Sequence, residues 1–233
     1  MQNDFPATPS VPENNAISRR AFIRFSVITG IASAGIFARD NALATTEQRT
    51  PRETEGPFYP LHQQQDKDTD LTLIETHTAS AKGEVIIVSG TVFDTQGRII
   101  EGAFIDIWQA NTWGRYRHAR DPNPAPLDPD FQGWGQTHTD AQGNYRFKTI
   151  LPGSYPAGPG WTRPPHIHFK ISRSGYTSLT TQMYFPGQAL NEVDLILQQH
   201  SAAEQKQLIA SRDNANTDAI PVFRFDIYLP SSV

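Results

Sequence analysis

The chain has 233 residues, a hydrophobic content of 37% and a formal net charge of −4. This length suits one domain with a leader. The net charge gives no electrostatic reason to bind nucleic acid or an anionic membrane surface. The sequence contains no cysteine, which excludes disulfides, thiolate metal sites and a cysteine nucleophile. Any bound metal must therefore be held by oxygen and nitrogen atoms.

Residues 1–44 have the features of an export leader. Arg19 and Arg20 precede an apolar run at residues 25–38, and Ala42–Ala44 offers a small-x-small cleavage site. This arrangement resembles a twin-arginine export signal. A membrane anchor is the alternative, but the apolar run is shorter than the ~20 residues that span a bilayer. We expect a disordered or cleaved leader, an exported protein in the periplasm or outside the cell, and no stable membrane insertion after processing.

Residues 45–233 are expected to form one domain of short strands separated by turns. Stretches rich in β-branched and aromatic residues predict the strands. A helical pattern covers Ala202–Ala210 and extends backwards, at most, through Asn191–Gln199. We therefore predict an all-β fold, an antiparallel β-sandwich with long loops that carry the site and one or two short helices. The expected strands are Glu84–Phe93, Ala103–Gln109, Asn144–Ile150, His166–Ser172, Thr177–Phe185 and Val222–Leu229.

One of these strands opens with a pair of histidines. Pro164 and Pro165 stiffen the loop before it, and His166 and His168 point to the same face of the strand. Two imidazoles on one face, about 7 Å apart at their Cα atoms, can converge on a single ion. Taken alone, such a pair more often consists of two polar side chains on a solvent-exposed strand face.

Two loops upstream carry tyrosines, Tyr116 in residues 114–118 and Tyr155 in residues 151–156. A phenol, with a pKa of about 10, becomes a ligand only when a strongly Lewis-acidic cation removes its proton. Two phenolates and two imidazoles form a hard, anionic donor set, which suits Fe(III) better than Zn(II). Considered separately, each tyrosine is more often a loop aromatic that packs on the core.

Seven short motifs follow one another in order from about residue 53 to the end of the chain. They are Glu55–Pro60, Asp106–Asn111, Gly114–His118, Pro152–Pro156, Arg163–Phe169, Thr181–Phe185 and Phe223–Ile227. Together they resemble the intradiol ring-cleavage dioxygenases, and within that family the iron-bearing subunits of protocatechuate 3,4-dioxygenase.

This resemblance implies a non-haem Fe(III) cofactor and a set of site residues. The expected metal ligands are Tyr116 as the equatorial tyrosinate, Tyr155 as the axial one, His166 and His168. The expected catalytic residues are Tyr155, which the substrate displaces, Arg163, which lies beside the substrate, and Gln182, which lines the oxygen side of the site.

The implied activity is the cleavage of a catechol-type ring between its two hydroxyls, with dioxygen, to give a muconate-type diacid. The diol binds as a dianion, and Arg163 stabilises negative charge on the ring. The partners are thus a small aromatic diol and dioxygen. The iron-bearing subunits that the chain resembles assemble with an unlike chain, whereas this chain has a complete ligand set, so a homo-oligomer is compatible with the sequence.

Two departures from the family bear on this reading. Family members specific for protocatechuate usually have a tryptophan after the Tyr-Pro pair, whereas Ala157 follows Pro156 here. That tryptophan forms part of the substrate pocket wall in those family members, and Trp161 is a candidate to replace it here. The sequence does not determine which substituents the ring of the substrate carries. The short stretch between the cleavage site and Glu55 also leaves no room for the helical dimerisation segment of the catechol 1,2-dioxygenases.

Three other functions are alternatives to this interpretation. The turns at residues 94–97 and 139–144 also resemble non-catalytic β-sandwich modules of secreted proteins, which have no reason to keep the tyrosines and histidines. A zinc or copper hydrolase lacks a positioned carboxylate ligand. Extradiol cleavage usually needs Fe(II) held by two histidines and one carboxylate, and the sequence around the His pair offers no carboxylate.

Two other histidines lie near the motifs but are not expected to bind the metal. His118 is expected to support the site or lie on the surface, and His138 to end a strand.

Overall fold

The computed structural model describes residues 48–61, 64, 66–213 and 220–232. The expected leader, with Arg19, Arg20 and the cleavage site, lies outside these described residues, and so the export prediction is untested by the structure. Within the described part, no helix combines the length and the hydrophobicity that a bilayer-spanning segment needs.

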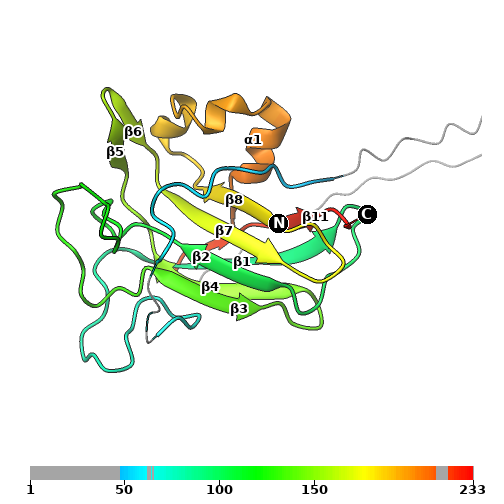
Figure 1. The fold of residues 1–233 in the computed structure, drawn as a ribbon, viewed down its shortest axis with the longest axis horizontal. Helices are drawn as coiled ribbons and strands as arrows, with labels where there is room; N and C mark the ends of the chain where they lie inside the picture. Colours follow the sequence, from blue (N-terminus) through cyan, green and yellow to red (C-terminus); the bar gives the residue numbers. More distant parts are fainter. Residues whose placement is uncertain (1–47, 62–63, 65, 214–219, 233) are drawn as a thin grey trace, which may run out of the picture. The chain divides into compact units, whose positions relative to one another are not determined.

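Two sheets pack face to face around the core (Figure 1). One sheet contains β1 (Val85–Asp94), β4 (Asn144–Ile150), β9 (Ser211–Arg212), β10 (Val222–Arg224) and β11 (Ile227–Leu229). The other, in spatial order, contains β3 (Trp134–His138), β2 (Phe104–Trp108), β7 (His166–Ser172) and β8 (Leu179–Tyr184). A separate hairpin is formed by β5 (Tyr155–Gly158) and β6 (Trp161–Arg163).

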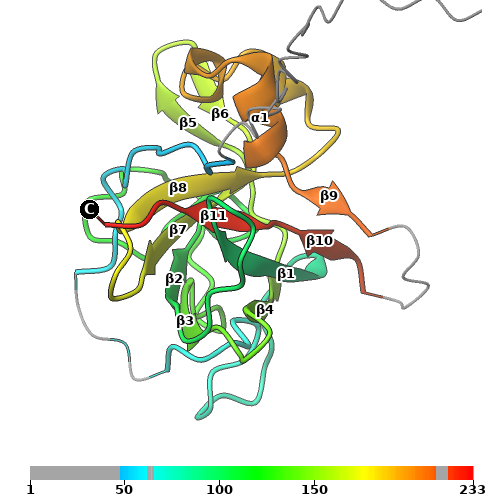
Figure 2. The same cartoon turned by 90° about the vertical axis from the view of Figure 1, so that its right-hand side faces the viewer.

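The helical segments follow β8 in the chain and lie beside it (Figure 2). They are two 3₁₀ turns, η1 (Ala189–Glu192) and η2 (Leu197–Gln199), and the helix α1 (Ala202–Leu208). Ser201 caps α1 in a capping box with Glu204, which satisfies free N–H groups at the start of the helix. Leu197 and Leu208 pack on Tyr184 at the end of β8.

The predicted sandwich is confirmed. The bounds of β4 and β7 agree with the predicted strands, and the predicted helix ends two residues earlier, at Leu208. The segment Asn191–Gln199 contains parts of η1 and η2 instead of an α-helix. The patterns gave no sign of β3, β5, β6 or β9, which are short and carry few β-branched residues.

Two strand pairs differ from the antiparallel prediction, because β1 pairs in parallel with β10 and with β11. The predicted strand Val222–Leu229 is interrupted between these two at Phe225 and Asp226. The Phe225 carbonyl accepts a hydrogen bond of 2.6 Å from the Tyr145 hydroxyl and lies against Gly90, where a Cβ atom would be 1.9 Å away. This close approach of two backbones breaks the strand.

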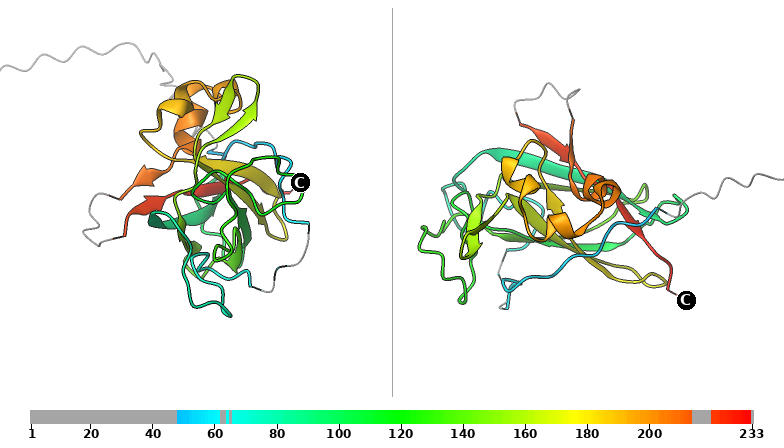
Figure 3. Two further views of the ribbon diagram at one scale, coloured as in Figure 1. Left: turned by 90° about the vertical axis from the view of Figure 1, so that its left-hand side faces the viewer. Right: turned by 90° about the horizontal axis from the view of Figure 1, so that it is seen from above.

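The N-terminal part of the domain covers the second sheet. Glu53 donates its N–H to the Thr180 carbonyl at the edge of β8, and the Gln182 side chain donates to the Thr54 carbonyl. The chain then passes close to His168 at Gly56. Figure 3 shows this segment, in blue, crossing the sheet. One face of β7 is therefore buried in the core through Ile167, Phe169 and Ile171, and the other is buried at His166 and His168 under the segment at residues 50–60. Further along the histidine face, Lys170 is partly exposed.

Candidate metal centre

The four predicted ligand side chains converge on one spot. The Tyr116 hydroxyl lies 3.1 Å from Nε2 of His168 and 3.4 Å from Nε2 of His166. The Tyr155 hydroxyl lies 3.4 Å from the same His166 nitrogen. All four side chains are buried, and Tyr155 is the most exposed of them at 7%. Residues 116, 155 and 166–168 are distant in sequence, so this convergence is a property of the fold.

The surroundings of the two histidines keep their rings neutral. The Nδ1 of His166 lies 2.7 Å from the Pro164 carbonyl and must donate to it, which leaves Nε2 with a free lone pair. Burial, followed by the positive charge of Arg163, lowers the pKa of His166 well below its usual value. Burial, followed by His166 and Arg163, does the same to His168. The His168 ring stacks on Trp108, 4.9 Å between centroids. Neutral imidazoles with fixed orientation are the form that binds metals.

Burial shifts the pKa values of the two phenols upward, whereas it lowers those of the histidines. Burial raises the pKa of Tyr116 well above its usual value, and burial also raises the pKa of Tyr155. Without a cation both phenols stay protonated. Two phenol oxygens with their protons and two imidazole nitrogens then share a small buried space, which the Arg163 guanidinium borders. A strongly Lewis-acidic cation would satisfy all four atoms and release those protons, so the residues fit such an ion.

Close backbone contact holds the two tyrosine loops together. Gly114 has a φ of +78°, and a Cβ atom there would lie 2.2 Å from the Ser154 carbonyl. Gly153 donates its N–H to the Asn111 carbonyl at 2.9 Å. These two glycines, each two residues from a tyrosine, let the loops approach closely enough for the phenols to meet.

Arg163 is fixed beside the histidines by a set of charged and neutral partners. Its guanidinium makes two contacts with the Asp194 carboxylate, at 3.1 and 3.2 Å, and donates to Gln182 at 2.9 Å and to the Tyr184 hydroxyl at 2.8 Å. One terminal nitrogen lies 3.3 Å from Nε2 of His166. Because all three nitrogens have partners, the guanidinium is held in one orientation.

Several of these partners were not foreseen from the sequence. Asp194 lies in an irregular stretch between η1 and η2. Glu53, which accepts a hydrogen bond from the Tyr184 hydroxyl and not from Arg163, precedes the motifs that point to the site. Gln182 bridges Arg163 and the Thr54 carbonyl, so its amide supports the arginine. Of the two other histidines considered, His138 ends β3 as expected, and His118 packs against the Phe58 ring.

A cavity of about 320 Å³ opens onto this centre. Tyr155, Arg163 and His168 line it, whereas Tyr116 and His166 are not among its lining residues. Ala157 and Trp161 both contribute to its wall, and so the tryptophan occupies the same cavity wall as the alanine that departs from the family. Within the described residues, no group of three or more His, Asp or Glu side chains could hold a metal. The tyrosines are therefore needed for any four-ligand site here.

Residues 54–231 match a protein family described as Dioxygenase. The chain is 41% identical over 183 residues to the protocatechuate 3,4-dioxygenase beta chain of Burkholderia cepacia, and the match covers 76% of this chain and 78% of that one. The chain belongs to the intradiol dioxygenase family. It is also 34% identical over 170 residues to a catechol 1,2-dioxygenase of Acinetobacter baylyi, over 64% of this chain and 50% of that protein, so it spans half the length of this second relative.

A solved structure supports the same conclusion. The dioxygenase domain of a dioxygenase–carbohydrate-binding fusion from Streptomyces sp. SirexAA-E superposes with a TM-score of 0.58 at 29% identity. The match covers 79% of this chain and all of that domain. The protein is thus an oxidoreductase of the ring-cleaving dioxygenase type, and the reading as a non-catalytic sandwich module is not supported.

Gly114→Ala tests whether the close loop contact positions the phenols of this intradiol dioxygenase. Gly97 has a similar φ of +80°, but nothing lies within 4 Å of the place where its Cβ would be. Each substitution should cost about 1–3 kcal/mol for the left-handed backbone, and Gly114→Ala should cost more because it clashes with Ser154. We expect only Gly114→Ala to reduce metal uptake, measured by metal analysis beside chemical denaturation. Equal effects of the two substitutions would contradict this account.

Proposed function

We propose that this intradiol dioxygenase holds Fe(III) through Tyr116, Tyr155, His166 and His168 and cleaves a catechol-type substrate that enters the cavity beside Arg163. The observation that carries the proposal is the convergence of two phenols and two neutral imidazoles on one buried point. Bound Fe(III) would supply a Lewis acid that draws electron density from the deprotonated ring.

The positions of the two tyrosines support different roles for them. Tyr155 lines the cavity, whereas Tyr116 is packed against the Phe58 ring, 4.9 Å between centroids. An entering diol would therefore meet Tyr155 first, and we propose that Tyr155 would be the exchangeable one of the two tyrosine ligands. Because burial raises the pKa of the Tyr155 phenol, its deprotonated oxygen would be basic enough to accept one hydroxyl proton of the diol.

Arg163 is placed to act on charge in the substrate. Its guanidinium is buried, fixed by Asp194 and exposed to the cavity beside His168. Negative charge that builds on the bound ring would meet a preorganised cation in a site of low water content. We propose that this electrostatic contribution is made mainly in the transition state. Arg163 also lies in a buried pair, so it needs no reorientation during the reaction.

The cavity favours diols without a charged ring substituent. Among its described lining side chains, the charged ones are Arg163 and Asp121, and Arg163 is already paired with Asp194. No further lining cation is present there to neutralise a carboxylate. The relatives act, by name, on protocatechuate, which carries a carboxylate, and on catechol, which does not. We propose a neutral catechol as the substrate.

Product analysis on a panel of diols tests the function. The purified iron-loaded protein should convert catechol to a colourless diacid that carries both atoms of dioxygen, identified by mass spectrometry with labelled oxygen. The ratio kcat/KM should be at least about tenfold higher for catechol than for protocatechuate, because an unpaired buried carboxylate is costly. A yellow semialdehyde product would indicate extradiol cleavage and refute the proposal. Preference for protocatechuate would refute the proposed substrate class alone.

The ligand assignment predicts graded effects of three substitutions. Tyr116→Phe and His168→Ala should remove most of the bound iron, since each deletes a donor that stays on the metal. Tyr155→Phe should retain more iron but shift the tyrosinate–Fe(III) absorption and slow substrate binding, because that ligand must leave. Metal analysis and visible spectra measure these effects. Full iron occupancy in all three variants would rule out this site.

We also propose export by the twin-arginine route, supported by Arg19, Arg20 and the weakly apolar run that follows them. Changing both arginines to lysine should leave the precursor unprocessed in the cytoplasm, which fractionation and immunoblotting would detect. A processed, exported double variant would contradict the proposal. Because the chain supplies all four proposed ligands, we also propose that it can form a homo-oligomer without an unlike chain, which the mass of the purified protein would test.

A further inference from the structure

Glu53 is a buried carboxylate that the proposed chemistry does not use. Its side chain has no solvent exposure and comes from the segment that covers the sheet. Both of its oxygens lie within hydrogen-bond distance of the Tyr184 hydroxyl, at 2.9 and 3.2 Å. A carboxylate buried without a functional or structural partner is costly, so its contacts need an explanation.

These contacts connect Glu53 to Arg163. The Tyr184 hydroxyl has one proton and can accept further hydrogen bonds. It accepts from the Arg163 guanidinium at 2.8 Å, so its own proton is directed to Glu53. Glu53 therefore determines which way the hydroxyl points, and the hydroxyl in turn contacts the guanidinium beside the metal ligands.

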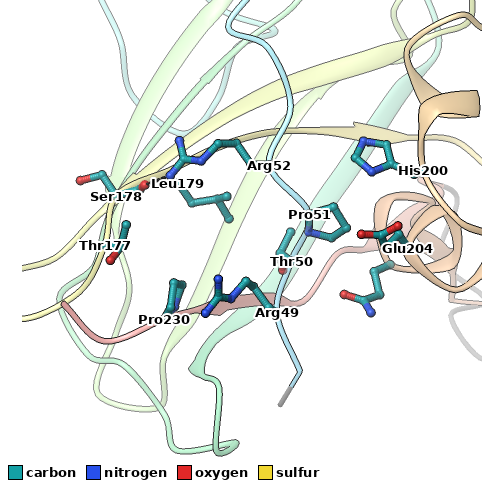
Figure 4. Close-up of a pocket in the computed structure, with 11 residues that line it drawn as sticks. Arg49, Thr50, Pro51, Arg52, Thr177, Ser178, Leu179, His200, Glu204 and Pro230 are labelled. Atoms are coloured by element: carbon teal, nitrogen blue, oxygen red, sulfur yellow. Dashed lines mark hydrogen bonds between the residues drawn. The ribbon is translucent and has the colours of Figure 1, made fainter. Parts of the chain in front are cut away.

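At its other end, this series of contacts between side chains reaches solvent. Nε2 of His200 lies 3.2 Å from a Glu53 oxygen, and the His200 side chain is 16% exposed. His200 lines a cavity of about 600 Å³ that is separate from the one at the metal centre (Figure 4). In this view His200 and Glu204 lie on one side of the cavity, and Arg52 extends from the segment that crosses it. The series His200, Glu53, Tyr184 and Arg163 thus runs from this second cavity to the metal centre.

We propose that Glu53, held by His200, is a positioning residue that acts through the Tyr184 hydroxyl to set the orientation of Arg163. This inference rests on the proposed function, because it assumes that Arg163 stabilises charge on the bound diol. The series transmits position and not protons, since a guanidinium keeps its protons at any ordinary pH. Asp194 fixes one side of the guanidinium, and Tyr184 fixes another.

The charge of Glu53 depends on pH within the physiological range. Burial, opposed by the hydrogen bond from Tyr184 and by Arg163, raises its pKa to about 7. The groups that face it are Tyr184 on β8, Arg163 on β6, Asp194 between the 3₁₀ turns, and His200. Ionised Glu53 accepts the Tyr184 proton more strongly than the neutral acid does. The best orientation of Arg163 is therefore reached above pH 7.

Glu53→Gln is the direct test, because it keeps the shape and removes the charge. We expect kcat for catechol to fall by about 10- to 100-fold, while KM and iron content change less than about twofold. The rise of kcat through about pH 7 should disappear in the variant. His200→Gln should lower kcat in the same direction by a smaller factor. Glu204→Gln, at the same cavity, is the matched control, since glutamine also serves in a capping box.

A second measurement needs no bound iron. The folded state holds the Glu53 proton more tightly than the unfolded state does, so the metal-free protein should lose stability as pH rises from 4.5 to about 7. Glu53→Gln should flatten this loss, seen as a smaller shift in Tm between pH 5 and pH 8. Glu204→Gln should leave the shift unchanged.

The outcomes separate the two proposals. If wild-type protein does not cleave any catechol, the proposed function fails, while the stability measurement still reports on Glu53. If wild type is active but Glu53→Gln keeps its kcat and its pH profile, the positioning role is wrong. Should Glu53→Gln fail to fold, His200→Gln decides: an unchanged kcat and pH profile in that variant would overturn the proposal.

Discussion

The burial of His166 and His168, on the face of β7 opposite the core, is the constraint on which the rest of the structure depends. One face carries Ile167, Phe169 and Ile171 into the core, and the other carries two histidines. Polar groups removed from water need partners, or they lower stability. The segment at residues 50–60, the two tyrosine loops and Arg163 all supply contacts or cover on that second face. The site and the fold are thus two results of the same requirement.

This requirement also explains the charged groups around the centre. Arg163 lies next to neutral histidines and would be an unpaired buried cation without Asp194. Burying such a charge alone is strongly unfavourable, whereas a well hydrogen-bonded pair is tolerated. Asp194 in turn accepts the backbone N–H groups of Ile196 and Leu197, which orders the turn at η2. The conformation of the irregular stretch after β8 is therefore fixed partly by the carboxylate that pairs with Arg163.

Much of the fold could be predicted because the patterns that specify it are local. The alternation in residues 144–150 and 166–172 gave β4 and β7 with their observed bounds. The four donors were found because they stand in three recognisable motifs, Tyr116 and Tyr155 in one each and the two histidines together in a third. The contacts of Arg163 with Asp194 and Tyr184, and of Tyr184 with Glu53, could not be found this way, since local sequence does not say which distant side chains meet. The break between β10 and β11 likewise depends on Gly90, a residue far away in the chain.

The parallel pairing of β1 with the last strands has a consequence for biosynthesis. The N–H of Thr91 bonds to the side chain of Asp226, 135 residues later, and β11 pairs with the end of β1. Contacts of such long range form late and slow the folding of a domain. A chain still attached to the ribosome cannot complete this sheet until its last strand has left the exit tunnel. Until then β1 can pair with β4 but not with β10 and β11, and the unpaired edge of the incomplete sheet favours aggregation.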